Sequence, residues 1–402
     1  MKSQAVLPTT SPEFAEAVKG EARRLGFELA GITTPEPPAH LDVYERWLAQ
    51  GCQGEMNYLS SERAVERRCD PRLLLPECRS IIVLGARYPS ALSRPAPEDS
   101  LRGKVAAYAW GSDYHEVLPA HMERLVTFIQ DLAGIVFAYR CYTDSAPLLE
   151  RELAQRAGLG WIGKNTCLIH PQKGSFFLLS EILLELELAL DPASTADRCG
   201  ACRRCLDACP TGCIQPNRTL DARRCLSYLT IELKGAIPPE LRISVGEWVF
   251  GCDICQQVCP WNVRFARPES TQENPGLLPG LSTRSGMPGP NLAKDLALSP
   301  DGFNQKFRYS ALKRAKRRGY GRNVAVALGN LVASSASSGQ IQEAVSALSR
   351  ALAGDTEPLV RSHAAWALGR IGNQAAREAL SQAEQDELDK AVLQEIHRAL
   401  LR

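Results

Sequence analysis

Hydrophobic and polar positions follow two different periods along the first half of the chain. Segments with apolar side chains at every third or fourth position predict helices over residues 13–26, 118–134 and 146–158. Short apolar runs predict strands over residues 79–89 and 135–143. This mixture indicates an α/β or α+β layer domain, which we place at residues 17–190. Residues 1–16 are expected to form a disordered lead-in.

The C-terminal part has a different pattern. A Pro/Gly/Ser-rich stretch indicates a connector at residues 263–305. The string RNVAVALGNL (322–331) then recurs as RSHAAWALGRIG (361–372), with the Ala-Leu-Gly steps forty residues apart. Alanine-rich helical pairs at about 40-residue spacing are typical of HEAT repeats, so we expect an all-α array over residues 306–402. The alternative is a plain helical tail in which the echo arose by chance.

Composition adds the class of protein and its compartment. The 402 residues are 45% hydrophobic and 23% charged with a net charge of +2, which is ordinary for a globular chain. The strongly apolar run at 176–190 carries three glutamates and is shorter than the ~20 residues of a membrane helix. The N-terminus shows no secretory pattern, so a cytoplasmic protein without a membrane partner is expected. In that compartment its fourteen cysteines more often bind metal than pair as disulfides.

Two cysteine motifs define a segment that we place at residues 191–262. The first, followed by Pro210, has the bacterial ferredoxin spacing C-x2-C-x2-C-x3-C-P and comprises Cys199, Cys202, Cys205 and Cys209. The second, followed by Pro260, comprises Cys252, Cys255 and Cys259, with Val249 at its first expected ligand position. A pair of zinc knuckles is the alternative, but it leaves both Cys-Pro steps unexplained. The doubled motif therefore predicts a ferredoxin module with two [4Fe–4S] clusters.

Ligand exchange between the two motifs predicts which thiols share a cluster. The last cysteine of each bacterial motif ligates the other cluster, so the first ligand set is Cys199, Cys202, Cys205 and Cys259. The second set begins with Cys209, Cys252 and Cys255 and lacks one member. Spacing favours Cys225 for that place over Cys213, which lies only four residues beyond Cys209 and can instead pack against the cluster.

Other cofactor motifs are missing from the sequence. No G-x-G-x-x-G follows a predicted strand, and no Walker A motif occurs. The base-off cobalamin motif D-x-H-x-x-G is incomplete, because Asp113 and His115 are followed by Leu118 in place of glycine. The residues alone thus indicate a cytosolic iron–sulfur oxidoreductase with a helical-repeat appendage.

Several local strings extend this interpretation. They are RRCDPRLLLP (67–76), WGSDYHEVL (110–118), YTDSAPLLERELAQRAGLGWIGKN (142–165), GSFFLLSEI (174–182) and RRCLSYLT (223–230). Together with the doubled cysteine motif and the repeats, they resemble the epoxyqueuosine reductase family. That family is in turn similar to reductive dehalogenases in its cobalamin-plus-ferredoxin core. The resemblance implies a multidomain α+β protein with a reductive-dehalogenase/nitroreductase-like α/β cobalamin-binding core, a two-cluster ferredoxin module and HEAT-like repeats.

The resemblance also implies an activity. Members reduce the epoxide of epoxyqueuosine at the wobble nucleotide of tRNA, using base-off cobalamin without a histidine ligand and two [4Fe–4S] clusters. The reaction consumes two electrons and two protons, so a proton donor and a low-potential electron donor, here unidentified, are required. The expected partner is the anticodon stem-loop of queuosine-containing tRNAs, and a monomer is expected.

Five positions carry over from the family as cofactor or catalytic residues. Asp144 matches the proton donor and also a cofactor contact, although its place before Ser-Ala-Pro equally suits a helix N-cap. Arg68 resembles the arginine that contacts cobalamin, against the alternative of a solvated charge. Ser227 and Asp253 resemble contacts between corrin and cluster. Leu168 would line the corrin pocket, although a leucine there is more often plain core.

A basic strip at residues 306–322 indicates nucleic-acid binding. It holds eight basic and no acidic residues, interleaved with Phe307, Tyr309 and Tyr320. Basic residues neutralise phosphates, and exposed aromatics stack on unpaired bases. The predicted tRNA-binding residues are Lys313, Arg314, Lys316, Arg317 and Arg318, with Lys234 as a further candidate. A solvated helical face or a protein-docking patch is the alternative.

Two other functions remain open from the sequence. One is a reductive-dehalogenase-like enzyme that acts on a small molecule, which would share the metals and ignore tRNA. The other is an iron–sulfur electron-transfer adaptor whose repeats dock a protein, which would contain no cobalamin.

Overall fold

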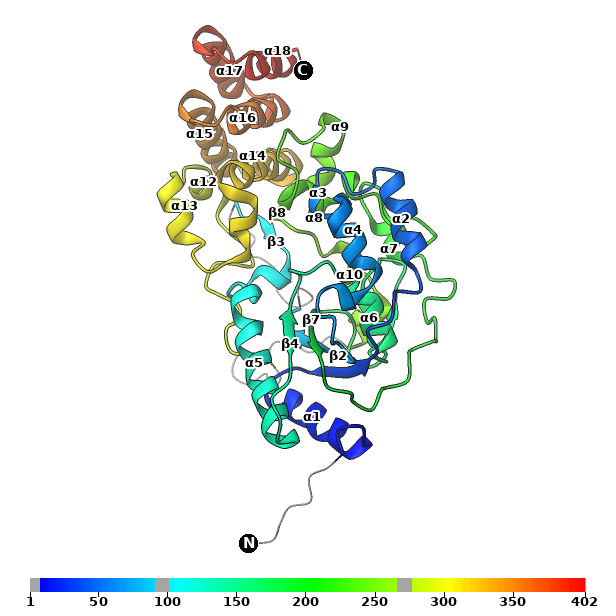
Figure 1. The fold of residues 1–402 in the computed structure, drawn as a ribbon. Coiled ribbons are helices and arrows are strands. Elements are labelled where there is room, and N and C mark those ends of the chain that lie inside the picture. Colours follow the sequence, from blue (N-terminus) through cyan, green and yellow to red (C-terminus); the bar gives the residue numbers. More distant parts are fainter. Residues whose placement is uncertain (1–7, 91–100, 266–276, 402) are drawn as a thin grey trace. The chain divides into compact units, whose positions relative to one another are not determined.

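The computed structural model of the protein describes residues 8–90, 101–265 and 277–401 (Figure 1). Its chain folds as two units. Unit 1 consists of Met1–Ser93, Gly111–Asp221 and Ile254–Thr283, and unit 2 consists of Arg94–Trp110, Ala222–Asp253 and Arg284–Arg402. The cysteine-rich segment 191–262 therefore contributes to both units and is not a body of its own.

Unit 1 contains the mixed α+β part of the chain. Its helices are α1 (Pro12–Arg24), α2 (Leu41–Ala49), α3 (Asn57–Ser60), α4 (Glu62–Cys69), α5 (Tyr114–Ala133), α6 (Glu150–Arg156), α7 (Arg204–Ala208), α10 (Ile254–Gln257) and α11 (Pro260–Phe265), with a 3-10 turn η1 (Pro71–Leu73). Its strands are β1 (Leu29–Thr33), β2 (Ser80–Arg87), β4 (Tyr139–Tyr142), β5 (Trp161–Ile162), β6 (Leu168–Ile169) and β7 (Phe177–Leu184).

Unit 2 is mainly helical. Its helices are α8 (Leu226–Ile231), α9 (Pro239–Arg242), α12 (Leu292–Leu296), α13 (Pro300–Lys306), α14 (Lys316–Ser335), α15 (Ser338–Gly354), α16 (Pro358–Ile371), α17 (Gln374–Asp386) and α18 (Lys390–Leu400). Its short strands and 3-10 turns are β3 (Lys104–Val105), β8 (Trp248–Phe250), η3 (Ala107–Ala109), η4 (Ala222–Arg224), η5 (Ile243–Val245) and η6 (Ala311–Ala315).

A four-stranded antiparallel sheet with the order β1-β2-β7-β4 is the centre of unit 1. Because side chains alternate between the faces of a strand, Ile81 and Val83 of β2 share one face with Leu183 of β7. Helix α6 covers that face, and its Leu153 and Ala154 belong to the same core cluster. Helices α1 and α5 pack against each other and against β1, β4 and β7. Glu181, on β7, has the same parity as Leu183 and therefore points toward α6.

The predicted strands and helices of this part are present with shifted ends. The strand expected at 79–89 is β2, and the helix expected at 118–134 is α5, which begins four residues earlier because Asp113 caps it through the His115 amide. The lead-in expected through residue 16 overlaps helix α1, which begins at Pro12 because the Ser11 hydroxyl accepts the Phe14 N–H. Residues 1–7 lie outside the described residues. Within the described residues no helix is long and apolar enough to span a bilayer.

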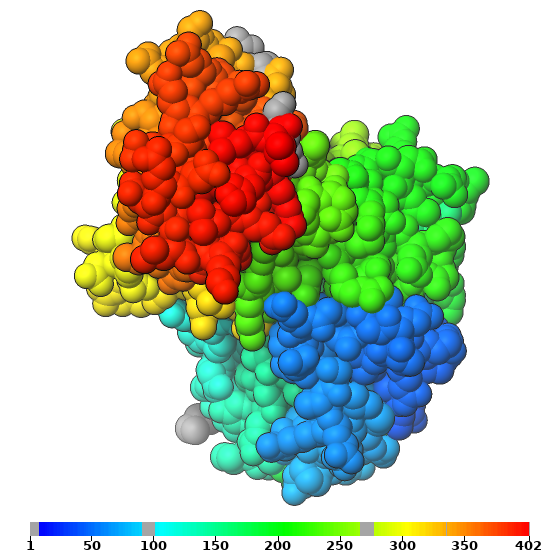
Figure 2. Space-filling view, turned by 90° about the horizontal axis from the view of Figure 1, so that it is seen from above, coloured from blue at the N-terminus to red at the C-terminus, as the bar shows by residue number. Residues whose placement is uncertain are grey.

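The repeat array of unit 2 follows the predicted pattern, and Figure 2 shows its helices as one continuous mass coloured from orange to red. Helix α14 packs on α16, and α16 packs on α18. The glycines of the two Ala-Leu-Gly steps lie at these contacts. A Cβ on Gly329 would lie 2.7 Å from the Cβ of Ala367, and one on Gly369 would lie 2.5 Å from the Cβ of Ala399. The repeated Ala-Leu-Gly step thus occurs at two equivalent close contacts, one between α14 and α16 and one between α16 and α18.

Buried hydrogen bonds and an ion pair connect the segment Ala222–Asp253 to the repeats within unit 2. The guanidinium of Arg322, which is fully buried, donates to the backbone oxygens of Leu229, Leu233 and Gly235. Arg242 forms a buried 2.8 Å ion pair with Glu395. The connector expected at 263–305 is likewise not a plain linker, because it contains α12 and α13, and α12 packs against α14. Residues 266–276 of that stretch lie outside the described residues.

We predict that Gly369→Ala destabilises the repeat array despite the higher helix propensity of alanine. Alanine gains about 1 kcal/mol in a helix interior, but overpacking a tight contact costs about 1–3 kcal/mol. The thermal unfolding midpoint should therefore fall. The matched control is Gly319→Ala in α14, whose added Cβ would meet only Ala315 at 3.9 Å; its midpoint should be unchanged or slightly raised. Equal midpoints for the two variants would contradict the packing role of Gly369.

Candidate active site

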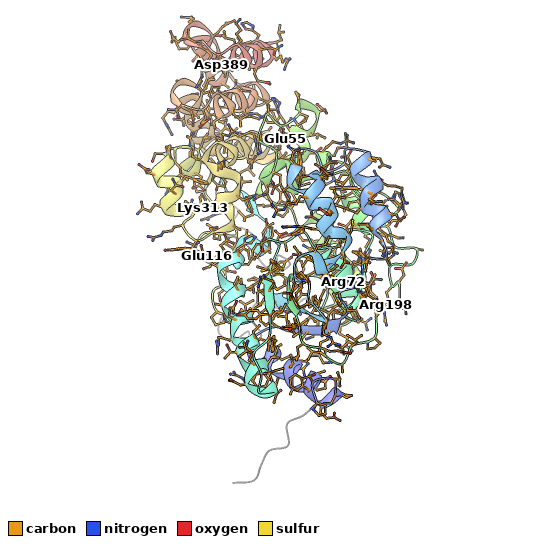
Figure 3. All side chains as sticks on the ribbon, in the orientation of Figure 1. Glu55, Arg72, Glu116, Arg198, Lys313 and Asp389 are labelled. Atoms are coloured by element: carbon orange, nitrogen blue, oxygen red, sulfur yellow. The ribbon has the colours of Figure 1, made fainter. Side chains whose placement is uncertain are left out.

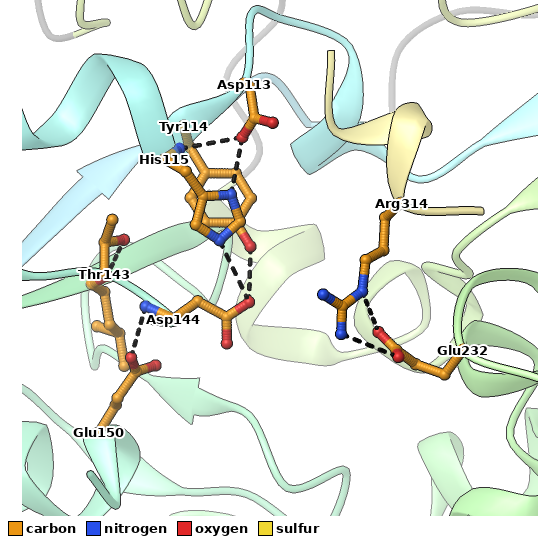
Figure 4. A network of polar contacts seen from close by, with 9 residues as sticks. Asp113, Tyr114, His115, Thr143, Asp144, Glu150, Glu232 and Arg314 are labelled. Carbon is orange, nitrogen blue, oxygen red and sulfur yellow. Dashed lines mark hydrogen bonds and ion pairs between the residues drawn. The ribbon is translucent and has the colours of Figure 1, made fainter. Parts of the chain in front are cut away.

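The loop between β4 and α6 presents the predicted donor, Asp144. Its backbone is in the left-handed region with φ 51°, which is unusual for a residue other than glycine. Two contacts hold the loop there. The Asp144 N–H donates to Oε1 of Glu150 at 2.8 Å, and the neighbouring Thr143 hydroxyl donates to the Leu179 oxygen at 2.9 Å (Figure 4). A strained residue held by specific bonds is typical of functional sites.

The alternative role of Asp144 as a helix cap is wrong. Helix α6 begins only at Glu150, and its N-cap residue is Leu149. The preceding Ser-Ala-Pro stretch is not helical, although Pro147 suggested a first helical turn. The Asp144 side chain therefore does not cap the helix that follows it.

The Asp144 carboxylate meets polar groups at the start of α5. The Tyr114 hydroxyl donates to its Oδ2 at 2.7 Å, and Nε2 of His115 lies 3.9 Å from the same oxygen. Nδ1 of His115 is 2.8 Å from Asp113, so the imidazole lies between two carboxylates (Figure 4). The other oxygen, Oδ1, has no partner among the described residues, and the side chain is 67% exposed. This oxygen is the one available to a ligand.

Two further carboxyl groups lie behind Asp144. Burial first, and the charge of Asp144 second, raise the pKa of Glu150 to about 7. Glu181 is fully buried, neither of its carboxyl oxygens has a hydrogen-bond partner in the described part, and burial raises its pKa well above the ordinary value. Glu150 and then Asp144 add to that shift. Both carboxyl groups therefore keep their protons to a higher pH than exposed glutamates do.

Arg68 is buried beside this group, at the end of α4. It is 7% exposed, so the interpretation as a solvated charge is wrong. One N–H donates to the Ala64 oxygen at 3.0 Å, and the guanidinium lies 5.7 Å from the Tyr44 ring centroid. No carboxylate of the described residues is within ion-pair distance, although Arg68 lowers the pKa of Glu150 through its charge. Leu168 is 6% exposed and belongs to the core cluster under α6.

The first predicted ligand set surrounds one cavity within unit 1. Cys199, Cys202, Cys205 and Cys259 all line it, and its volume is about 240 Å³. The described residues contain no group of three or more His, Cys, Asp or Glu side chains close enough to hold a single metal ion. Four cysteines in ferredoxin spacing that line one cavity suit the corners of a cubane [4Fe–4S] cluster.

Residues of the WIGKN string hold this thiol loop, a role that the sequence did not predict for them. The indole N–H of Trp161 donates to Sγ of Cys199 at 3.4 Å. Nζ of Lys164 donates to the backbone oxygens of Gly200 and Cys202 at 2.6 and 3.0 Å. No spacing rule marks such contacts, because they connect positions almost forty residues apart. Hydrogen bonds of this kind orient metal ligands and tune them electrostatically.

The remaining predicted cysteines fall in different units. Cys209 and Cys255 belong to unit 1, and Cys225 and Cys252 belong to unit 2. Cys213 is buried, with its Sγ 3.5 Å from Sγ of Cys209. Cys213 thus lies beside a predicted ligand, and the choice of Cys225 as the last ligand of the second set stays a prediction.

Two other predicted cofactor contacts lie in unit 2. Asp253 is 1% exposed, and its Oδ2 accepts the Ala107 N–H at 2.7 Å. Ser227 lies in the first turn of α8, two residues after Cys225. Asp253 thus fixes the backbone of the neighbouring Ala107–Ala109 turn, whatever else it contacts.

The basic strip is only partly available to a ligand. Exposed positions are Lys313, Arg314, Lys316 and Arg318, and Lys234 is also exposed; Figure 3 labels Lys313. Arg314 pairs with Glu232 at 3.0 Å (Figure 4), and Arg317 pairs with the buried Asp355.

The expectation of exposed stacking aromatics is wrong for two of the three rings in this strip. Phe307 and Tyr320 are buried against each other, with ring centroids 4.9 Å apart, whereas Tyr309 is 51% exposed.

Family comparisons agree with this architecture. Residues 198–262 match the 4Fe-4S double cluster binding domain, residues 68–145 match the family described as epoxyqueuosine reductase QueG, DUF1730, and residues 310–400 match HEAT repeats. A mixed α+β core joined to a double-cluster segment and HEAT repeats defines an iron–sulfur oxidoreductase.

Whole-chain comparisons are more specific. The chain is 40% identical to the epoxyqueuosine reductase of Pseudomonas aeruginosa over 91% of its length and 96% of the relative. It is 36% identical to that of Salmonella typhimurium, over 90% of each protein. It belongs to the epoxyqueuosine reductase family.

Solved structures of epoxyqueuosine reductases share the whole fold. One contains an epoxyqueuosine-modified tRNA-Tyr stem loop and is similar with a TM-score of 0.84 at 30% identity, over 97% of this chain and 98% of the other. Another, from Bacillus subtilis, has its catalytic aspartate loop swung out of the active site, with a TM-score of 0.82 at 30% identity and the same coverage.

The raised pKa of Glu150 predicts a pH-dependent stability. Its folded-state pKa, about 7, exceeds the ordinary 4.5, so its contribution is complete below pH 4.5 and is lost as the pH rises to about 7. Glu150→Gln cannot ionise and keeps an oxygen for the Asp144 N–H. The fall in thermal midpoint between pH 5 and 8 should therefore be smaller in this variant, with Glu116→Gln, an exposed carboxylate, as the control. An identical fall in Glu150→Gln and wild type would contradict the assignment.

Proposed function

We propose that this chain reduces the epoxide of epoxyqueuosine at the wobble position of tRNA and so produces queuosine-tRNA. The observation that carries the proposal is the Asp144 loop, in a chain that belongs to the epoxyqueuosine reductase family along nearly its whole length. A carboxyl group with one free oxygen, held in a strained turn beside two carboxyl groups whose pKa values are raised, suits the protonation that epoxide opening requires. The activity belongs in the cytoplasm, and the protein acts as a monomer.

The residues fit the cofactors that this reaction needs. Four thiols around one cavity suit a [4Fe–4S] cluster, and the guanidinium of Arg68, which has no carboxylate partner within the described residues, suits a large ligand with polar substituents, such as a corrin. When bound, two clusters and a cobalamin supply the low-potential electrons that reduce the epoxide. We assign the second ligand set to Cys209, Cys225, Cys252 and Cys255, and the corrin contacts to Arg68, Asp144, Leu168, Ser227 and Asp253.

No protein histidine is proposed as a cobalt ligand. His115, the histidine of the incomplete motif, bonds to Asp113 at 2.8 Å, and Leu118 is buried where that motif has glycine. The base-off form without a histidine ligand is consistent with this arrangement.

Asp144 acts as the proton donor. Reduction of the epoxide to an alkene with loss of water consumes two electrons and two protons. Tyr114 donates to Oδ2 and fixes the orientation of the carboxyl, which leaves Oδ1 to carry the proton toward the substrate oxygen. The Glu150 carboxylate holds the loop through the Asp144 N–H, and bound ligands exclude water from the exposed side chain.

The strip on unit 2 binds the anticodon stem-loop. Lys313, Lys316 and Arg318 are exposed, and in the described residues they have no ion-pair partner, so their charges are available to phosphates. Tyr309 supplies an exposed ring for an unpaired base. Arg314, Arg317 and Lys234 remain candidates, although Arg317 is already neutralised by Asp355. A dehalogenase that acts on a small molecule would need no such surface.

Asp144→Asn tests the donor role. It keeps an oxygen for the Tyr114 hydroxyl but cannot supply a proton, so the single-turnover rate on an epoxyqueuosine stem loop should fall by about 10²–10⁴-fold. Affinity for the stem loop should not change, and the rates are compared at equal cofactor content because Asp144 is also an assigned corrin contact. The nearby, exposed Glu116→Gln should keep the wild-type rate. A rate within a few-fold of wild type in Asp144→Asn would exclude Asp144 as the donor.

Charge removal tests the strip. Each phosphate contact steepens the fall of log affinity with log salt by about 0.9 for B-form duplex DNA and about 0.7 for single strands. The triple variant Lys313→Gln/Lys316→Gln/Arg318→Gln should therefore bind the stem loop more weakly and with a slope about two units shallower. The control triple Arg350→Gln/Arg377→Gln/Lys390→Gln removes the same charge elsewhere on the repeats and should leave both quantities unchanged. Unchanged binding in the first triple would exclude the strip.

A further inference from the structure

The cavity that the four thiols line has a positively charged rim. Lys164, Arg198, Arg204 and Arg264 border it, and no carboxylate is among its lining residues. The three arginines are exposed. Figure 3 labels Arg198, which lies toward the outer edge of unit 1 in that view. A cavity built to hold a redox centre thus has a border of a single charge sign.

Neighbouring acids do not neutralise this rim. Asp197 pairs with Arg218, and Asp207 lies 3.4 Å from Arg203. Within the described ranges, neither Arg198 nor Arg204 has an ion-pair partner. The rim charge is therefore available to something outside the protein.

Lys164 and Arg264 also meet no carboxylate. Lys164 is bonded to two backbone oxygens, and Arg264 lies 5.5 Å from the Phe265 ring centroid. Apolar surface adjoins these charges, because Val263 is 54% exposed and Trp261, which lines the cavity, is only partly buried. Exposed apolar side chains beside a charged rim are the composition of a transient protein interface.

We propose that this rim is the docking surface for an acidic, low-potential electron-carrier protein of the flavodoxin or ferredoxin class. The proposal rests on the proposed function, in which the thiols hold a [4Fe–4S] cluster that must receive electrons from outside. Each docking event transfers one electron, so the carrier is oxidised by one electron while the centre is reduced by one, and no bond forms or breaks.

The second ligand set is an unsuitable point of entry in this scheme. Ser227 follows Cys225 by two residues, Asp253 follows Cys252 by one, and both are assigned to the corrin side. We therefore assign electron entry to the rimmed cavity, defined by Cys199 and its three partners, where complementary charge raises the association rate of an acidic carrier by about 10–10³-fold. RNA is assigned to the strip on unit 2, where Lys313 and its neighbours are exposed without a redox centre.

The test uses the anaerobically purified holoprotein, an FMN-loaded acidic flavodoxin as probe, and the double variant Arg198→Glu/Arg204→Glu. At low salt the variant should bind the flavodoxin at least about tenfold more weakly, and the reduced flavodoxin should bleach the cluster absorption at least about tenfold more slowly. Both differences should shrink at high salt. Reduction by the methyl viologen radical cation should not slow, and affinity for the tRNA stem loop should not change.

Matched controls separate the rim from net charge. Arg63→Glu/Arg124→Glu reverses two exposed arginines elsewhere in unit 1 and should keep the wild-type flavodoxin affinity, whereas Arg198→Lys/Arg204→Lys should retain most of it. Unchanged flavodoxin binding in the rim variant overturns the proposal. Loss of stem-loop binding in the rim variant would show instead that the rim binds RNA. Slower reduction by the viologen would show that the arginines affect the redox properties of the cluster itself.

The failure of the proposed function would be seen separately from the failure of the docking surface. If the purified wild-type protein has no iron–sulfur absorption, the proposed function fails before any carrier is added.

Discussion

The bond from the Asp144 N–H to the Glu150 carboxyl is the contact on which the proposed chemistry depends. It holds a left-handed residue between a strand and a helix, and it does so with a group that is itself a titratable acid. The backbone, rather than the side chain, of Asp144 is thereby fixed to the core. Its carboxyl stays free to meet Tyr114 on one oxygen and a ligand on the other.

Burial of acidic groups around this bond has an electrostatic logic. Glu181 lies on the strand face that α6 covers, where a carboxylate without partners would be costly, so burial raises its pKa. Arg68 brings a buried positive charge to the same region. Two carboxyl groups with raised pKa values and a buried guanidinium thus lie close to the exposed Asp144. Such perturbed titratable groups are costly to stability and are typical of functional sites.

Much of the fold and of the thiol site could be predicted from the sequence, because periodic patterns and fixed residue spacings depend on local geometry. The strand at 79–89, the helix of α5, the repeated Ala-Leu-Gly steps and the doubled cysteine spacing all report local geometry. The turn at Asp144 could not be predicted in this way. No glycine or asparagine indicates its positive φ, and the nearby Pro147 is typical of a helix start that does not form here. The run of basic and aromatic residues at 306–322 was also only partly interpreted correctly, because the partners of some of its side chains are distant in the sequence. Arg322 and Tyr320 look like a ligand surface in sequence, but their partners, Leu229 and Asp295, lie at least twenty-five residues away.

The order of the thiols along the chain has a consequence for biosynthesis. Three of the four cysteines that line the rimmed cavity occur within seven residues, but the fourth, Cys259, is separated from them by the whole segment Ala222–Asp253, which folds with unit 2. A nascent chain therefore presents an incomplete thiol set until translation has passed Cys259. Under the proposed ligand assignment, the cluster is completed only late in translation, after the segment whose buried contacts are with the repeats has been made.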